Sequence, residues 1–290
     1  MWTTTYRSLP VELSESQIDA LCTLLEDDQA IVSGVLDRQI ASMSDEDQER
    51  LFKRLLDSPP RRISLPRTLE DFHRQRLELA FSDWAVPPVG EPQLEEGIFL
   101  LASFGYPLED VSRCLAELDQ MAEELKGRVE GLERGEEIVR RMGYFLHEEL
   151  GFDGHREDYY NPENSYFNRV LDRRVGIPIT LSALYLLVGR RAGLPFRGIG
   201  MPGHFIVKYE VPEAPIYLDP FAGGRIVTVA QCEDIVRELG YHFDIRFLKE
   251  TPDARIVERM INNLIGIYHR EGDEERSRQL VRYQEIIQRS

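Results

Sequence analysis

The segment from residue 164 to residue 224 limits the possible folds most strongly, because one apolar helical run is followed by two strand-like runs. Residues 179–192 have the apolar content of a buried helix, and the runs HFIVKYE and IYLD come after it. His204 opens the first run and Asp219 closes the second. Two adjacent antiparallel strands can bring such a pair side by side, so that the carboxylate orients the imidazole as in a hydrolytic triad.

The nucleophile that such a pair would activate is missing from the expected place. At the start of the apolar helix the chain reads Gly-Ile-Pro at 176–178, without a cysteine. Thr180 and Ser182 could substitute a hydroxyl, and Ser182 lies about one turn after Pro178 on the same helix face. A serine in an apolar helix more often bonds back to a carbonyl, and it needs a nearby base to react. Ser182 is therefore a candidate nucleophile, and the alternative is that its hydroxyl only forms a structural hydrogen bond to a backbone carbonyl.

The three cysteines, Cys22, Cys114 and Cys232, are widely spaced and form no disulfide framework or CxxC metal pattern. Cys232 is the one that lies within the predicted core domain, but it follows His204 and Asp219 along the chain. Triads do permute their chain order, so a catalytic role is conceivable, although a small buried apolar residue is the simpler interpretation. We expect no metal site and no cofactor, because no phosphate loop, HExxH motif or zinc-ligand set is present.

Arginine is concentrated in the same segment. Six arginines and one acidic residue lie between Ser165 and Gly200, which gives a local charge of +5 in a chain whose net charge is −16. Guanidinium groups suit carboxylates, phosphates and acidic peptides. A ligand site is therefore predicted at Asn164, Asn168, Arg169, Arg173 and Arg174. Two structural alternatives remain: the arginines pair with acidic N-terminal helices, and Asn164 or Ser165 serves as a helix N-cap.

Composition excludes several classes of function. The net charge of −16 and the sequence pI near 4.9 argue against nucleic-acid binding through the whole surface. The first residues show no signal-peptide pattern, and the longest weakly polar run, residues 176–189, is too short to span a bilayer. We therefore expect a cytoplasmic protein without a membrane segment. The arginine-rich segment favours a protein or an acidic peptide as its partner.

The rest of the chain is predicted to be largely helical. Helical spacing or capping signals mark residues 12–57, 68–83, 94–103, 108–149 and 229–240, and strand character is confined to residues 196–229. The run HFDIRFL at 242–248 could add a last strand. Residues 253–289 read as two helices around Gly272, similar to one degenerate TPR unit. The predicted domains are a helical domain at 1–140, a core at 141–250 and a helical pair at 251–290.

Four stretches resemble a known family: EEGIFLLASFGYP (95–107), YYNPENSYFNRVLDRRVGIPITLS (159–182), MPGHFIVKY (201–209) and LDPFAGG (218–224). Together they are similar to the SirB-one type of the transglutaminase-like superfamily, in which a helical N-terminus precedes a papain-related core. The resemblance implies an α+β fold. It also implies that His204 and Asp219 correspond to the second and third triad members and that Pro178 stands near the position of the catalytic cysteine.

Two main functions, and a weaker third, are consistent with the absence of a cysteine at this position. The first is a degenerate, non-catalytic transglutaminase-like protein that binds a protein or an anionic ligand in a regulatory role. The alternative is a hydrolase or acyltransferase, of amidase or protease type, in which His204 and Asp219 activate a non-cysteine nucleophile such as Ser182. A weaker third option has His204 acting as a general base on water. Whether the chain is an enzyme stays open, with the missing cysteine favouring a non-enzymatic role.

Overall fold

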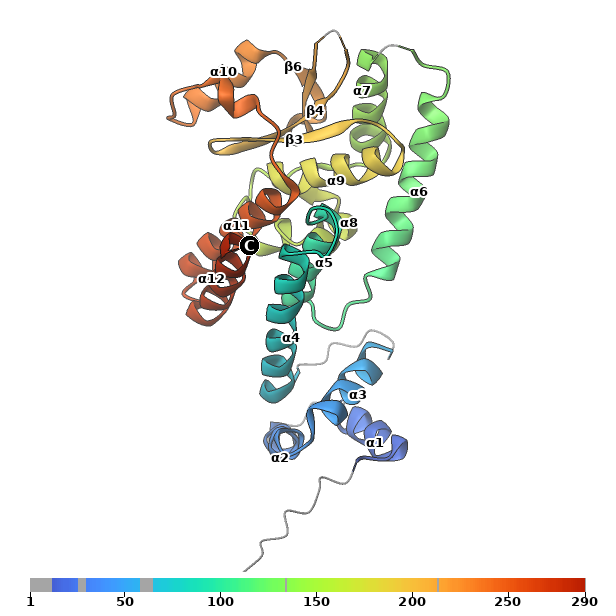
Figure 1. Cartoon of the computed structure of the whole chain (residues 1–290), viewed down its shortest axis with the longest axis vertical. Coiled ribbons are helices and arrows are strands. Elements are labelled where there is room, and N and C mark those ends of the chain that lie inside the picture. Colours follow the sequence, from blue (N-terminus) through green and yellow to red (C-terminus); the bar gives the residue numbers. More distant parts are fainter. Residues whose placement is uncertain (1–11, 26–29, 58–64, 134, 213, 290) are drawn as a thin grey trace, which may run out of the picture. The chain divides into compact units, whose positions relative to one another are not determined.

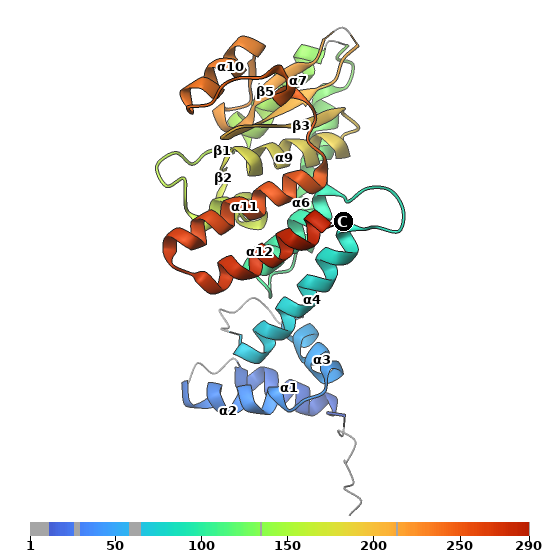
Figure 2. The ribbon, with the colours of Figure 1, turned by 60° about the vertical axis from the view of Figure 1, so that its left-hand side comes forward.

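The computed structural model describes residues 12–25, 30–57, 65–133, 135–212 and 214–289. The chain divides into two compact units (Figures 1 and 2). Unit 1 comprises residues 1–79 and 106–110, and unit 2 comprises residues 80–105 and 111–290. The two units are described separately below.

Unit 1 is helical. Its elements are α1 (Glu15–Leu25), α2 (Ala30–Ala41), α3 (Asp45–Leu56) and the first part of α4 (Arg67–Ala85). Ser44 caps α3 by accepting a hydrogen bond from the amide of Asp47 at 3.2 Å, and acidic residues fill the first turn as the sequence predicted. One side of each helix supplies the core, which includes the buried residues Ile18, Leu21, Ile40, Leu51 and Leu69.

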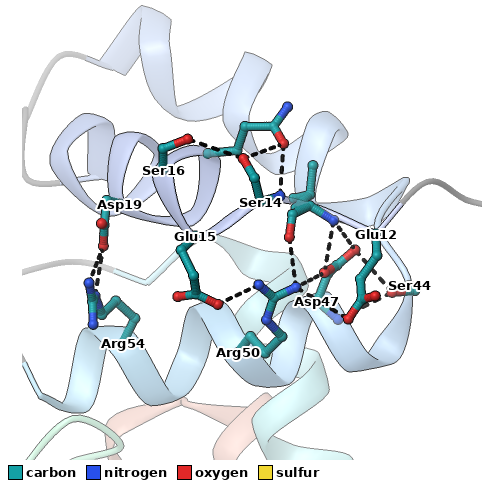
Figure 3. Close-up of polar contacts among 11 residues, drawn as sticks. Glu12, Ser14, Glu15, Ser16, Asp19, Ser44, Asp47, Arg50 and Arg54 are labelled. Carbon is teal, nitrogen blue, oxygen red and sulfur yellow. Dashed lines mark hydrogen bonds and ion pairs between the residues drawn. The ribbon is translucent and has the colours of Figure 1, made fainter.

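A buried carboxylate joins the start of α1 to α3 (Figure 3). Asp47, only 2% exposed, accepts the amide of Leu13 at 3.3 Å and Nη1 of Arg50 at 2.8 Å. Arg50 also donates to the Leu13 carbonyl at 2.8 Å and to Glu15 at 2.6 Å. Because a buried carboxylate is costly unless its oxygens are paired, these bonds hold the entry of α1 against α3.

Unit 2 contains the remaining helices around a small sheet. Its α-helices are α5 (Leu94–Gly105), α6 (Ser112–Val129), α7 (Gly135–Tyr144), α8 (Phe167–Arg173), α9 (Pro178–Arg191), α10 (Val229–Glu238), α11 (Asp253–Glu271) and α12 (Glu274–Arg289), together with the end of α4. A π-helical turn, η1 (Phe145–Glu149), extends α7. The 3₁₀ turns are η2 (Pro162–Asn164), η3 (Pro220–Ala222) and η4 (Ile245–Leu248).

The main sheet is antiparallel, in the order β3 (Phe196–Met201), β4 (His204–Tyr209), β5 (Ile216–Asp219) and β6 (Arg225–Val227). In Figures 1 and 2, α9 lies on one face of this sheet and α10 on the other. Residues of α10 pack with Ile199, Met201 and Ile206 in one apolar cluster. Two short parallel strands, β1 (Asp153–Gly154) and β2 (Val175–Gly176), pair outside the main sheet.

The structure confirms the buried helix and the hairpin strands, and it corrects three local predictions. Residues 242–248 do not form a strand, because Asp244 accepts the amide of Arg246 at 2.8 Å and starts the 3₁₀ turn η4. Neither Asn164 nor Ser165 is a helix N-cap: Asn161 caps η2, and α8 begins after Tyr166. Strand structure is not confined to residues 196–229, since β1 and β2 precede it.

Two helices follow the core as predicted. α11 and α12 meet at Gly272, whose φ of +77° ends α11 in the left-handed conformation that glycine adopts without a steric penalty. α11 packs against both α12 and α5. The TPR-like character of this helical pair stays a prediction.

The turn at Gly223 and Gly224 requires glycine for both conformation and space. Their φ angles are +72° and +68°. A Cβ on Gly224 would lie 2.4 Å from Oη of Tyr185 and 2.8 Å from Cα of Gly143 in α7. The turn after Asp219 therefore allows α7, α9 and the end of β5 to approach each other closely.

We predict that Gly224→Ala lowers the free energy of unfolding by about 2–4 kcal/mol, because a left-handed non-glycine residue and overpacking each cost about 1–2 kcal/mol or more. Gly266→Ala, in an exposed part of α11 with no atom within 4 Å of the new Cβ, is the control. It should raise stability by about 0.5–1 kcal/mol. Urea unfolding of the two variants tests this; equal effects would contradict the account of the turn.

Candidate functional site

The register of the sheet brings His204 and Asp219 together. The β3–β4 hairpin pairs Met201 with His204, so His204 is the first residue after the turn. β4 pairs with β5 through Val207 and Leu218, and continuing this register sets Asp219 opposite Ile206. Because side chains alternate along a strand, His204, Ile206 and Asp219 share one face, and His204 is the diagonal neighbour of Asp219.

The predicted hydrogen bond between the two side chains is present. Nε2 of His204 lies 3.0 Å from Oδ2 of Asp219, and the residues are 9% and 3% exposed. The second carboxylate oxygen, Oδ1, accepts the amide of Phe221 at 3.0 Å and caps η3. Asp219 thus orients the imidazole and also stabilises the Asp-Pro-Phe corner. Among the described residues, Nδ1 of His204 has no hydrogen-bond partner, so the imidazole keeps one nitrogen for a ligand or water.

The hydroxyls on α9 are engaged by the backbone. Pro178 occupies the first position of the helix, where its missing N–H removes nothing. Oγ1 of Thr180 accepts the amide of Ile177 at 3.1 Å and donates to the carbonyl of Asn164 at 2.9 Å. Ser182 is fully buried, and its hydroxyl donates to the carbonyl of Phe205 at 3.3 Å. Neither hydroxyl bonds to the His204 imidazole. The candidate nucleophile Ser182 bonds instead to the backbone of β4, the strand that carries His204.

Cys232 lies on α10 in the apolar cluster with Met201 and Ile206, on the sheet face that His204 and Asp219 share. Burial, with the nearby negative charge of Asp219, raises the pKa of its thiol to about 11. A nucleophilic cysteine needs the opposite shift, toward the thiolate. The structure therefore gives Cys232 the environment of a core residue.

Asn164 connects several segments beside the start of α9. It is fully buried; its Oδ1 accepts Nη1 of Arg173 at 3.0 Å and lies 3.2 Å from Nδ1 of His155. Its Nδ2 donates to the carbonyl of Asp158 at 2.7 Å, while its own carbonyl accepts from Thr180. These bonds satisfy the amide side chain and hold the 155–164 loop against α9. Asn168, in α8, is also buried, at 1% exposure.

The three arginines that the sequence indicated as ligand residues have carboxylate partners. Arg169 pairs with Asp172 at 2.8 Å and with Glu163 at 3.2 Å. Arg173 lies 3.5 Å from Glu163, and Arg174 lies 2.5 Å from Glu117 of α6. Arg174 is also the one non-glycine residue in the described chain with a left-handed backbone, at φ 59°. These ion pairs compensate the charges of the three arginines within the chain. A ligand anion could bind to the arginines only by displacing their carboxylate partners.

An aromatic and cationic group next to His204 was not predicted. The ring of Phe221 lies 6.2 Å from His204, with Tyr159 and then Tyr160 following edge to face. Arg156 stacks on Phe221 with its Cζ 4.8 Å from the ring centroid, and it donates to the Phe221 carbonyl at 2.7 Å. The one sequence signal for this group was the pair of tyrosines, Tyr159 and Tyr160, in a polar loop. No local pattern connects these tyrosines to Phe221, which is far along the chain.

Two arginines of α11 complete this group. Nη2 of Arg259 donates to the carbonyls of Met201 at 2.9 Å and His204 at 3.1 Å, so it braces the hairpin turn that carries the imidazole. Burial lowers the pKa of Arg259. Arg270 stacks on Tyr160, 3.8 Å from the ring centroid. Within the described part of the chain, neither guanidinium has a carboxylate within 4.0 Å.

The order of helix, hairpin and carboxylate strand agrees with comparison to known proteins. The family model of the transglutaminase-like superfamily matches residues 112–262, just over half of the chain. The chain belongs to the transglutaminase-like superfamily. The matched region begins with α6 and includes α9, the main sheet and the first half of α11, and thus both His204 and Asp219.

Several relatives share this region. A UPF0162 protein of Xylella fastidiosa is 32% identical over 175 residues, covering 58% of this chain and 62% of the relative. Human F-box only protein 21 is 35% identical over 159 residues, covering 52% of this chain but 25% of that protein. A UPF0162 protein of Pseudomonas aeruginosa is 28% identical over 188 residues, 63% of this chain and 67% of its own length. Among solved structures, none gives a significant match.

No helix among the described residues is long and apolar enough to cross a lipid bilayer. Within the same residues, no three His, Cys, Asp or Glu side chains are grouped so that they could hold a metal ion.

We predict that Cys232 of the native protein reacts slowly with a disulfide reagent at pH 8. With a pKa near 11, about one thiol in a thousand is ionised at that pH, and the side chain is fully buried. Reaction followed spectroscopically should reach three thiols per chain in denaturant and stay near zero without it. Rapid native labelling that maps to Cys232 would contradict the core assignment.

We expect charge reversal in Arg173→Glu to lower the melting temperature by several degrees, because it removes the bond to buried Asn164 and sets two carboxylates together at Glu163. Arg237→Glu on α10 is the matched control, since among the described residues Arg237 pairs only with Glu233 of its own helix. That control should shift the transition by about a degree or less. An unchanged Arg173→Glu melt with weakened ligand binding would favour the ligand role instead.

Proposed function

We propose that this transglutaminase-like chain acts by binding a protein or another anionic ligand, without a covalent thiol intermediate. The observation that carries this proposal is the state of the possible nucleophiles. Pro178 begins α9, Thr180 and Ser182 bond to backbone, and Cys232 is a buried core thiol with a raised pKa. His204 and Asp219 form their mutual hydrogen bond, and neither Thr180 nor Ser182 bonds to the imidazole.

The ligand is proposed to carry a carboxylate or phosphate that approaches His204. The sequence suggested Arg169, Arg173 and Arg174 for this contact, together with Asn164 and Asn168. Arg259 and Arg270 are proposed in their place, because no described carboxylate lies within 4.0 Å of either and an incoming anion need not displace an internal carboxylate. The exposed ring of Tyr160 and the half-buried ring of Tyr159 would add apolar contact.

A regulatory role in the manner of a SirB-one type protein is part of this proposal. Its support is the resemblance of the four sequence stretches to that family. The UPF0162 relatives share about three fifths of the chain, and their names state no role. Because the chain spans less than two thirds of the first of these relatives, any activity of a whole relative remains a proposal here. The predicted TPR-like helices α11 and α12 fit this view, since α11 supplies Arg259 and Arg270.

One observation favours hydrolysis as a second candidate. An imidazole that a carboxylate orients through Nε2, with Nδ1 lacking a partner in the described chain, has the arrangement of a general base. In this alternative His204 would deprotonate a bound water or a substrate hydroxyl. Ser182 would need to leave the Phe205 carbonyl before it could serve as the nucleophile.

Parallel capture and activity assays separate the two candidates. Immobilised wild type, His204→Ala, Arg270→Gln and Arg237→Gln are challenged with cell extract and eluted with rising salt, and the bound proteins are quantified. Arg270 is exposed, so its substitution should leave the fold intact. Binding predicts salt-sensitive partners that Arg270→Gln loses about tenfold and Arg237→Gln retains, because an exposed ion pair is screened by salt.

The activity arm uses amide, ester and amine-incorporation substrates. The binding proposal predicts background rates that are equal for wild type and His204→Ala. Turnover by the wild type that His204→Ala abolishes would establish the hydrolase alternative. Identical capture by Arg270→Gln and wild type would remove Arg270 and Tyr160 from the proposed ligand site.

A further inference from the structure

A groove lies between α7 and the turn that leads into β6, on a surface that His204 does not line. It encloses about 720 Å³. One side is formed by Glu137, Arg141, Tyr144 and Glu148, and the other by Gly224 and Arg225 together with their neighbours. The four helical residues recur at intervals of three or four, so they form a single stripe along α7 and η1.

The dimensions of the groove suit an extended chain. The stripe from Glu137 to Glu148 spans eleven residue-to-residue steps, or about 16 Å at 1.5 Å per residue. An extended peptide rises about 3.3 Å per residue, so about five residues would fill this length. A small compact ligand would leave much of the stripe uncovered.

The strand that borders the groove has an unused edge. β6 is the last strand in the order β3-β4-β5-β6, and no described strand pairs with its other side. Strand edges present N–H and C=O groups that can bind another extended segment. Gly143 approaches the carbonyl of Gly224 so closely that a Cβ there would lie 2.8 Å from its oxygen, which fixes α7 beside this turn.

The charges of the groove select a particular side chain. Arg140 pairs with Glu136 at 2.6 Å, but in the described residues no carboxylate lies within 4.0 Å of Arg141 or Arg225. Both uncompensated guanidinium groups line the groove, while Glu137 and Glu148 stand near the ends of the helical stripe. An acidic side chain would therefore be favoured at the centre, and a further acidic residue beside Glu148 would be repelled.

We propose that this groove binds an extended segment of a partner protein, about five residues long, with a single acidic residue at its centre. The segment adds to the edge of β6, and its acidic side chain lies between Arg141 and Arg225. Apolar side chains of the segment contact Tyr144 and Ile226. This surface is separate from the arginines near His204, so the inference does not depend on the function proposed above.

The test is selection of randomised nine-residue peptides displayed on phage against the immobilised full chain. Enrichment of Asp or Glu at one position, flanked by β-branched or aromatic residues, is expected. The double variant Arg141→Gln/Arg225→Gln should abolish this preference and weaken the selected peptides at least tenfold. Arg140→Gln, which changes a groove residue with an ion-pair partner, should leave affinity within about twofold. Unchanged melting curves of all variants verify their folding.

Three results would overturn the proposal. The first is no enrichment, or enrichment of several acidic residues together. The second is a preference that survives the double variant or is lost equally in Arg140→Gln. The third is a concentration-dependent dimer, seen by sedimentation, that the double variant dissolves, because the occupant would then be a second copy of this chain. N-methylation at alternate backbone positions of a selected peptide should also abolish binding; unchanged affinity would exclude addition to the strand edge.

Discussion

The burial of α9 is the constraint on which the rest of unit 2 depends. Every residue from Pro178 to Gly189 is buried, so this helix must be covered on all sides. The main sheet covers one side, where Phe196 lies so near Gly189 that a Cβ there would meet its ring at 2.3 Å. α5, α6, α8 and α11 pack against the others. Burying such a helix stabilises by about 1.5–3 kcal/mol for each large apolar side chain, and it fixes the sheet whose register joins His204 to Asp219.

This constraint explains which features the sequence could predict. An apolar run followed by two strand-like runs predicts a buried helix and a hairpin. Because His204 opens the first of these runs and Asp219 closes the second, the sequence also predicts that the two side chains lie close together. The prediction of a strand at 242–248 was wrong because Asp244 accepts a hydrogen bond from the amide of Arg246. This local bond outweighs the alternation of apolar and polar residues in the segment. An N-cap role was one alternative for Asn164, but its side chain bonds to Arg173 and to the Asp158 carbonyl instead. Arg259 of α11 contacts the backbone of Met201 and His204 through packing between distant parts of the chain, and no local sequence pattern predicts such packing.

The candidate site combines a hydrogen-bonded His204–Asp219 pair with a helix α9 that begins at Pro178. Asp219 bonds both to His204 and to the Phe221 amide, so the pair is also part of the architecture of the corner before Gly223 and Gly224. That second role gives a physical reason for the pair to persist without catalysis. The surrounding guanidinium groups fall into two classes: Arg169, Arg173 and Arg174 compensate internal carboxylates, and Arg259 and Arg270 do not. Recognition of an anion is the chemistry that this difference favours.

The proposed binding role requires that none of Thr180, Ser182 and Cys232 forms a covalent intermediate with an acyl donor. Intact-protein mass spectrometry after incubation with activated acyl donors, followed by an acid quench that preserves thioesters and esters, tests it most directly. The account predicts the unmodified mass at all times, for wild type and His204→Ala alike. A stoichiometric acyl adduct that forms in wild type, is absent from His204→Ala and maps to Thr180, Ser182 or Cys232 would contradict it.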